Sequence, residues 1–233
     1  MVEPTPSEDV ILQVRAEFGS RTLLSFSCGK DAIASWVAIR DHFDEVVPYH
    51  LYLVPGLEFV EEALAYYEGV FGCRIIRLPH PTLYRWLNGG LFQTPGRAKV
   101  VEAARLDNHS YMDCHDWACK EAGLPLTVLS ATGVRAADSP MRRMAMLRHG
   151  AVNRRKKLFY PIWDWRKDRL IDAIERSGIR LPVDYEMFGR SFDGLDLRFL
   201  APLKRHRPAD YRRVLEWFPL AEMEIYRHER SLQ

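Results

Sequence analysis

Long apolar runs are missing from this chain of 233 residues. No stretch approaches the roughly 18 to 20 apolar residues that a helix needs to span a bilayer. The first residues, Met1-Val2-Glu3-Pro4-Thr5, also lack the basic start and the apolar stretch of a secretory signal peptide. These absences predict a cytoplasmic protein with no membrane partner.

Cysteine is scarce as well. The chain has four cysteines, at positions 28, 73, 114 and 119, and their uneven spacing favours free thiols over a disulfide framework. We find no internal repeat and no low-complexity tract in the sequence. Hydrophobic residues make up 47% of the chain and charged residues 27%, so it is long and apolar enough for one sizeable core.

The net charge of +2 hides an uneven distribution. Residues 41–68 contain seven acidic residues and no Lys or Arg, whereas residues 135–157 contain eight Lys or Arg and one acid, Asp138. The second segment predicts a local positive potential that attracts phosphate groups or nucleic acid. A solvated basic face without a ligand is the alternative.

Strand-like and helix-like segments alternate along the chain. Short apolar runs bounded by turn residues predict strands, and amphipathic segments between them predict helices. Asp31 and Asp164 each precede or open a helical pattern, so both are expected to be N-caps. The strands are expected at residues 22–27, 46–54, 73–78 and 126–133, and helices after residue 31 and at 58–70, 109–122, 166–177 and 208–217.

This alternation predicts an α/β, Rossmann-like fold, in which a parallel sheet has helices on both faces. We expect the sheet to form a domain over residues 1–180, with an irregular insertion or lid at about 81–108. Residues 181–233 are expected to form a C-terminal helical and irregular region packed on it. Ligands of such sheets bind at the carboxyl ends of the strands, so the loops at 25–31 and 133–143 are expected to lie together.

The first of these loops has the composition of an anion site. It reads Ser25-Phe26-Ser27-Cys28-Gly29-Lys30-Asp31 and joins a strand to a helix, so its N–H groups and the helix dipole face the same point. Its serines add hydroxyl donors, its lysine adds a mobile charge, and its glycine permits a close approach. The spacing differs from the Walker pattern. A tight turn without a ligand is the alternative.

The segment Ser27-Cys28-Gly29-Lys30-Asp31-Ala32 resembles the loop of the PP-loop superfamily, the adenine nucleotide alpha hydrolase-like proteins, which reads Ser-Gly-Gly-x-Asp-Ser. Three further segments, in the expected order, are similar to motifs of the phosphoadenosine phosphosulfate (PAPS) reductase family. They are Val54-Pro55-Gly56-Leu57-Glu58-Phe59, Thr132-Gly133-Val134-Arg135-Ala136-Ala137-Asp138-Ser139-Pro140-Met141-Arg142 and Tyr160-Pro161-Ile162-Trp163-Asp164-Trp165.

The resemblance implies a pocket for the phosphates of an adenine nucleotide, either ATP or PAPS. Arginine forks match phosphate oxygens, so Arg135 and Arg142 are expected to close over them. Mg²⁺ between the phosphates, held by Asp31 and Asp138, is an alternative to structural roles for these carboxylates. The catalytic residues are expected to be Lys30, Asp31 and Arg135, and the nucleotide-binding residues Ser25, Ser27, Cys28, Gly29, Lys30, Asp31, Gly133, Arg135, Ser139 and Arg142.

Departures from the family pattern narrow the expected activity. The thiol-dependent reductases use a cysteine near the C-terminus, and this chain has none after Cys119. The paired cysteines that hold an iron-sulfur cluster in some relatives are absent too. We therefore expect an enzyme that activates an acceptor by adenylation and releases pyrophosphate. The alternatives are sulfonucleotide reduction and a non-catalytic nucleotide- or nucleic-acid-binding component of a DNA or RNA modification complex.

Cys28 and Ala32 replace the glycine and the hydroxyl residue of the family loop. A cysteine at a helix N-terminus beside Lys30 has a favoured thiolate, so one hypothesis is a reactive Cys28. A small buried loop residue is the alternative.

Two other groups of residues suggest ligands. Only one cluster resembles a metal site, and because it lacks C-x-x-C pairs we expect core packing and no metal. The second group interleaves basic and aromatic side chains, which is typical of nucleic-acid surfaces, unless the aromatic residues belong to the core. The first cluster is His109, Cys114, His115 and Cys119; the second is Arg154, Arg155, Lys156 and Lys157 with the aromatic residues that follow.

Overall fold

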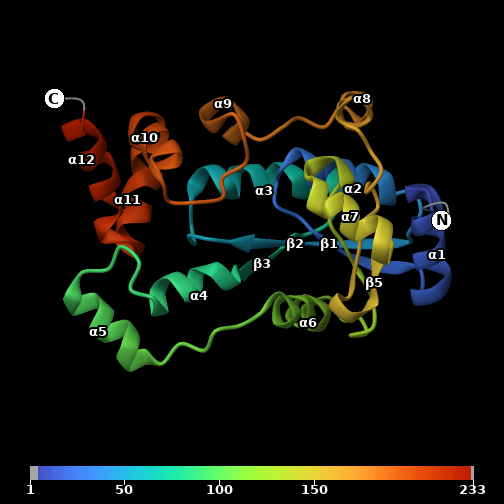
Figure 1. Ribbon diagram of the computed structural model, residues 1–233, viewed down its shortest axis with the longest axis horizontal. Helices are drawn as coiled ribbons and strands as arrows, with labels where there is room; N and C mark the ends of the chain where they lie inside the picture. The colour runs from blue at the N-terminus through green and yellow to red at the C-terminus, as the bar shows by residue number, and fades with distance from the viewer. Residues whose placement is uncertain (1–4, 232–233) are drawn as a thin grey trace. The chain divides into compact units, whose positions relative to one another are not determined.

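A six-stranded sheet is the centre of the α/β architecture (Figure 1). The computed structural model describes residues 5–231. The strand order is β3-β2-β1-β4-β6-β5; the pairs β1–β2, β1–β4 and β4–β6 are parallel and β5–β6 is antiparallel. The strands are β1 (Arg21–Ser25), β2 (Glu45–Tyr52), β3 (Ile76–Pro79), β4 (Ser130–Ala131), β5 (Val152–Asn153) and β6 (Leu158–Phe159).

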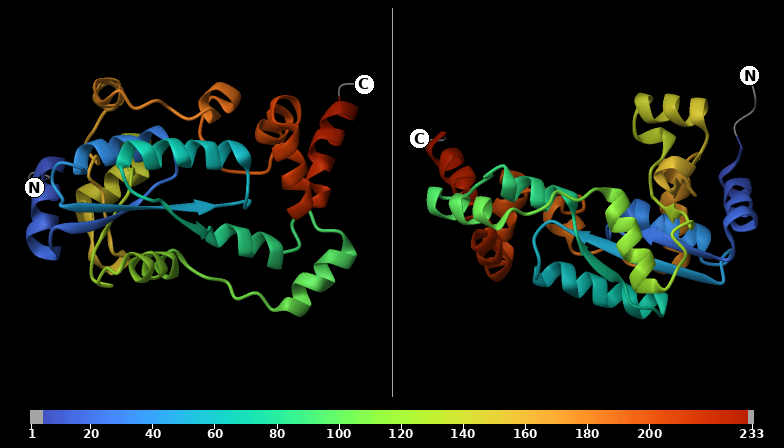
Figure 2. Two further views of the ribbon diagram at one scale, coloured as in Figure 1. Left: turned by 180° about the vertical axis from the view of Figure 1, so that it is seen from behind. Right: turned by 90° about the horizontal axis from the view of Figure 1, so that it is seen from below.

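Helices flank this sheet on both faces. Helix α2 lies on one face and α6 on the other, and α8 packs against α2 (Figures 1 and 2). The expected Rossmann-like α/β class is thereby confirmed. The α-helices are α1 (Ser7–Phe18), α2 (Lys30–Ile39), α3 (Glu58–Phe71), α4 (Pro81–Asn88), α5 (Pro95–Ala104), α6 (Tyr111–Ala122), α7 (Pro140–His149), α8 (Lys167–Ser177), α9 (Asp184–Phe188), α10 (Leu197–His206), α11 (Pro208–Trp217) and α12 (Glu222–Ser231).

The local sequence explains the elements that hold the site. β1 carries Leu23 and Leu24, whose side chains are fully buried, as expected for a central strand of a parallel sheet. In α2 the buried residues Ile33, Trp36 and Ile39 recur at helical spacing and face the core. The loop between β1 and α2 is therefore held at both ends by elements that are anchored in the core.

Contacts divide the chain into two compact units, each discontinuous in sequence. The first contains residues up to His50, Val70–Leu78 and Met112–Leu181. The second contains Leu51–Gly69, Pro79–Tyr111 and the residues from Pro182 onward. The expected boundary near residue 180 follows sequence order and stays a prediction.

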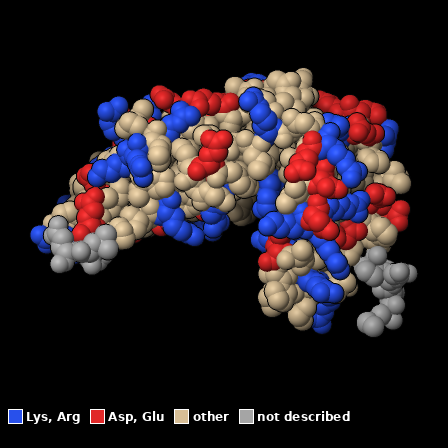
Figure 3. Space-filling model, turned by 90° about the horizontal axis from the view of Figure 1, so that it is seen from above, with Lys and Arg blue, Asp and Glu red and all other residues tan. Residues whose placement is uncertain are grey.

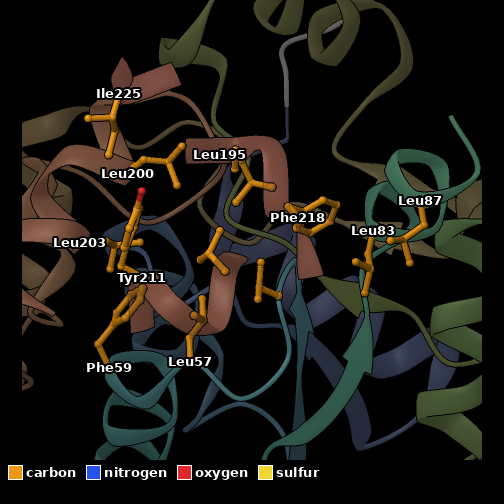
Figure 4. Packing of buried hydrophobic residues seen from close by; sticks show 13 residues of the cluster. Leu57, Phe59, Leu83, Leu87, Leu195, Leu200, Leu203, Tyr211, Phe218 and Ile225 are labelled. Atoms are coloured by element: carbon orange, nitrogen blue, oxygen red, sulfur yellow. The ribbon is translucent and has the colours of Figure 1, made fainter. Parts of the chain in front are cut away.

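The second unit has its own apolar cluster (Figure 4). Side chains from α3, α4, α10 and α11 meet in it, among them Phe59, Leu83, Leu203 and Val214. Burial of such side chains stabilises a fold by about 1.5 to 3 kcal/mol each relative to exposure, before entropy is counted. The segment after β3 and the C-terminal helices thus form one core.

The irregular character expected of residues 81–108 is wrong, because this segment contains α4 and α5; its being an insertion or lid stays a prediction. Gly89 is the C-cap of α4, and Thr94 and Pro95 start α5. The glycines and prolines therefore mark helix ends.

Three further differences concern lengths and termini. The strand expected at 126–133 shrinks to Ser130–Ala131, and the helical and irregular region expected at 181–233 begins with α9. Among the individually expected elements there is no counterpart for α1, α7, α10, α12, β5 or β6. Among the helices of the described residues, none has the length and apolar character needed to cross a membrane.

Candidate phosphate site

The two expected loops follow neighbouring strands. Leu24 of β1 lies beside Ala131 of β4 in parallel register, so both strands end at the same edge of the sheet. From β1 the chain continues to β2 and β3 on one side, and β4 lies on the other. This reversal of strand order is the topological switch point at which α/β sheets bind ligands.

Direct contacts join the loops at this point. Nε of Arg135 lies 2.8 Å from Oδ1 of Asp31. A Cβ on Gly133 would stand 2.6 Å from the backbone carbon of Asp31, well inside van der Waals contact, so only glycine fits there. The structure therefore brings Asp31, Gly133 and Arg135 together, as the sequence predicts.

Arg135 is the buried centre of this arrangement, with a side chain 8% exposed. Beyond Asp31, it pairs with Asp138 at 2.9 Å, and its backbone N–H donates to the same carboxylate at 3.0 Å. Oδ2 of Asp138, which accepts that backbone N–H, also accepts from Nη1 of Arg142 at 2.9 Å. Arg135 thus has two carboxylate partners, and Arg142, 52% exposed, has one.

Lys30 and the serines occupy the exposed side of the loop. Nζ of Lys30 lies 3.0 Å from Oδ2 of Asp31, and its side chain is 34% exposed. Ser27 is exposed and Ser25 partly so. These groups can donate to an anion without leaving the protein surface.

Helix α2 begins differently from the expectation for Asp31. Gly29 is the N-cap, and no side chain caps this terminus, so the N-cap role expected of Asp31 is wrong. The first helical bonds run from the N–H groups of Ala32 and Ile33 to the carbonyl of Gly29. The N–H groups of Lys30 and Asp31 precede that ladder, at the positive end of the helix dipole.

Charge also favours an anion here. Lys30, Arg135 and Arg142 supply three cations, and Asp31 and Asp138 supply two carboxylates, which leaves one net positive charge. Both carboxylates are engaged by cationic side chains. Across residues 5–231 no group of three His, Cys, Asp or Glu is arranged to hold a metal. This donor set fits a phosphate chain.

Cys28 adopts a left-handed backbone, with φ of 60°. Non-glycine residues reach this region at a cost of about 1 to 2 kcal/mol, which explains why a glycine suits this place in the loop. The side chain is 4% exposed. That burial is compatible with the small-residue alternative, and the reactivity of Cys28 stays a hypothesis that alkylation of the folded protein tests.

Ser139 and Asp164 act at helix ends. The Ser139 hydroxyl accepts from the N–H of Arg142 and is the N-cap of α7. The expectation that Asp164 caps the helix at 166 is wrong: Arg166 is the N-cap of α8, and the Asp164 carboxylate accepts from the N–H of Ser7, the first residue of α1. Indole N–H groups of Trp163 and Trp165 donate to Thr5 and Ser7 beside it.

His50 supports the loop but is not among the residues expected from the sequence. Nδ1 of His50, in β2, lies 2.9 Å from the carbonyl oxygen of Phe26 and so links β2 to the loop. In the sequence, the signal for this residue was a histidine within the otherwise apolar run at 46–54; in the structure its side chain is buried. Its ring hydrogen bond explains why a polar residue occupies this strand.

The metal-like cluster has structural partners. Nε2 of His115 lies 3.0 Å from the carbonyl oxygen of Val128, and Nδ1 lies 2.9 Å from Asp116. Burial raises the pKa of Cys114 to about 12 and that of Cys119 to about 11. The two thiols therefore stay protonated at neutral pH.

The basic run at 154–157 is partly neutralised. Arg154 pairs with Glu17 at 2.8 Å, and Lys157 pairs with Asp116 at 2.7 Å. Arg155 and Lys156 are exposed. The aromatic residues Phe159, Trp163 and Trp165 are buried, so they belong to the core and offer no open stacking surface.

No family model matches the chain, and no curated protein matches its sequence. The solved structures that are similar to this chain include the following two. PAPS reductase from Candida auris, in a phosphate complex, shares 10% identity over 82% of this chain and 88% of that chain, with a TM-score of 0.49. The U34-tRNA thiolase NcsA from Methanococcus maripaludis, with its [4Fe-4S] cluster, shares 12% identity over 92% of this chain and 78% of that chain, with a TM-score of 0.46.

Proposed function

We propose that this chain is a PP-loop enzyme that binds ATP or a related adenine nucleotide by its phosphates where β1 and β4 end. The observation that carries the proposal is the 2.8 Å contact between Arg135 and Asp31, which joins the two loops at the switch point of the sheet. Around that contact lie a helix N-terminus, a lysine and an exposed arginine. Anionic phosphate groups are the ligands that such donors favour.

The proposal divides the cationic side chains by exposure. Lys30 and Arg142 keep open surface beside their carboxylate partners, so they are proposed to contact phosphate oxygens. Arg135 is buried between two carboxylates and is proposed to position Asp31 and Asp138. Ser25, Ser27 and the N–H groups of Lys30 and Asp31 complete the phosphate contacts.

If ATP is the substrate, the proposed reaction is adenylation. An acceptor oxygen or other nucleophile bonds to the α-phosphorus, the bond to the bridging oxygen breaks, and pyrophosphate leaves with the electron pair. Lys30 would stabilise the charge that develops on the phosphate chain, since preorganised cations act most strongly where charge appears. Mg²⁺, where required, would be held mainly by the phosphates, because Asp31 and Asp138 already pair with cations.

Sulfonucleotide reduction has weaker support. A reductase needs an accessible thiolate, and Cys28, Cys114 and Cys119 are buried, the last two with raised pKa. A non-catalytic binding component remains the other alternative. Exposed Arg155 and Lys156 favour a nucleic-acid partner for it.

Calorimetric titration of the purified protein with ATP, AMP and PAPS tests the binding proposal. We expect Lys30→Ala and Arg142→Ala to weaken binding of the preferred nucleotide by about tenfold or more, because each removes a charge-assisted hydrogen bond. Lys167→Ala, at an exposed lysine that begins α8, is the matched control and should bind normally. Wild-type affinity in both site variants would overturn the site.

A pyrophosphate-release assay distinguishes the proposed enzyme from the non-catalytic binding component. Tight nucleotide binding with release in the presence of a candidate acceptor supports adenylation. Binding without release across carboxylate, amine and nucleic-acid acceptors favours the binding component. Release of sulfite from PAPS with a thiol reductant would favour the reductase alternative.

A further inference from the structure

Helix α7 exposes most of its apolar surface. Of its large hydrophobic side chains, Met146 alone is buried, while Met141, Met144 and Leu147 are 76%, 66% and 53% exposed. Helices in globular proteins are held mainly by packing of an apolar stripe, and α7 packs very little of its own. A large apolar face left in solvent marks an interaction site.

Two hollows adjoin this face and share a wall. One has a volume of about 490 Å³ and is lined on α7 by Pro140, Arg143 and Leu147. The other has a volume of about 280 Å³ and is lined by Met146 and Leu147. Leu147 and Trp163 line both and form an apolar wall between them; we call the two hollows together with this wall the trough. The apolar wall can contact the side chains of a partner.

The rim of this trough is positively charged. The guanidinium groups of Arg143 and Arg166 line the larger hollow, and neither pairs with a carboxylate within residues 5–231. The carboxylate that lines the trough, Asp164, accepts the N–H of Ser7. The rim therefore offers two cations to a partner and little acid to repel one, which is charge complementarity for an acidic ligand.

We propose that the trough beside α7 docks an acidic segment of a partner protein, whose apolar side chains enter the hollows while its carboxylates pair with Arg143 and Arg166. Apolar anchors surrounded by polar contacts are the usual energetic pattern of such interfaces. Nucleic acid fits less well, because bases stack on exposed aromatic rings and Trp163 is buried. Ala136, Ala137 and Ser139, from the loop that carries Arg135, also line the larger hollow, so the trough borders the proposed nucleotide site. Its test needs no nucleotide.

Fluorescence anisotropy with the full chain tests this. The probe is a short fluorescein-labelled peptide in which pairs of Glu and Asp alternate with Leu and Phe. We expect saturable binding, weakened about tenfold by Arg143→Glu or Arg166→Glu, since each places like charge opposite a carboxylate. Leu147→Ser, which removes the shared wall, should weaken binding as well. Circular dichroism confirms that each variant is folded.

Arg148→Glu is the matched control, because Arg148 lies on α7 and lines neither hollow. Unchanged binding in this variant supports the trough, and equal weakening would overturn it in favour of general charge attraction. A peptide with Ser at the Leu and Phe positions should not bind. The proposal is also overturned if the first peptide does not bind, or if a single-stranded oligonucleotide displaces it at lower concentration. Self-association of the chain that Arg143→Glu abolishes would assign the trough to a second copy and overturn the proposal too.

Discussion

At the scale of single residues, the site depends on how buried charges are balanced. Arg135 stands between Asp31 and Asp138, and each contact is shorter than 3 Å. Such an arrangement stabilises the fold only while it is complete, because an unpaired buried charge costs far more than a paired one. The resemblance implies phosphate contacts for this arginine, whereas its contacts in the structure are to the two carboxylates.

The two arginines of this loop should therefore respond differently to truncation. We expect Arg135→Ala to lower the free energy of unfolding by about 1 to 3 kcal/mol, because it removes the buried partner of two carboxylates that keep only Lys30 and Arg142 at the surface. Arg142→Ala removes an exposed pair and should cost less than about 1 kcal/mol. Urea unfolding measures both, and equal costs would contradict the proposed division of roles.

Cys28 offers a second test at this scale. Its φ of 60° suits glycine, so we expect Cys28→Gly to unfold with a free energy about 1 kcal/mol higher than Cys28→Ala. Comparison of these two variants removes the contribution of the deleted sulfur. In α2 the order should reverse, since Ala34→Gly lowers stability by about 1 kcal/mol at an ordinary helical position. The same order at both positions would show that Cys28 is not strained.

At the scale of elements, the close approach of the β4 loop to α2 depends on Gly133. An added Cβ would meet the backbone of Asp31, which has no flexible end that can move aside. We expect Gly133→Ala to cost about 1 to 3 kcal/mol through this overpacking and to weaken nucleotide binding. Urea unfolding and calorimetric titration measure the two effects.

Gly69, in the last turn of α3, is the control for the same substitution. Nothing lies within 4 Å of the Cβ that alanine would add there. Gly69→Ala should raise stability by about 0.5 kcal/mol through helix propensity. A neutral result at Gly133 would mean that the loops do not approach so closely in solution.

The sequence predicts these elements well where a local pattern decides them. α2, α3, α8 and α11 lie within a few residues of expectation because apolar periodicity and Pro or Gly at the ends are local signals. Helix caps supplied by residues far away in the sequence are not predicted in this way. Asp164 serves α1, and Asp210 accepts from the N–H of Phe59 at the start of α3, 151 residues away. Sequence spacing carries no sign of such pairings.

At the scale of the whole molecule, strand order explains why the meeting of the two loops was foreseeable. Alternation of strands and helices predicts a parallel sheet, and the ligand rule for such sheets then brings together loops about a hundred residues apart. The two compact units were not foreseeable, because each is assembled from three separate stretches of chain. Which segments belong to each unit is decided by which apolar side chains pack together; Leu83 and Leu203, for example, lie in one cluster.

Charge at this scale limits nucleic-acid binding. On the face shown in Figure 3, Lys and Arg side chains are interspersed with Asp and Glu, and the net charge is +2. Long-range attraction should therefore be weak, and any binding local to Arg155 and Lys156. We expect a gel-shift titration with single-stranded RNA to give a plot of log affinity against log salt whose slope falls in magnitude by about 1.4 when both are changed to Ala. This is about 0.7 for each cation that no longer meets a phosphate. Arg154→Ala should lower it less, because Glu17 already neutralises that guanidinium. A slope that is unchanged in the double variant would remove residues 154–157 as a nucleic-acid surface.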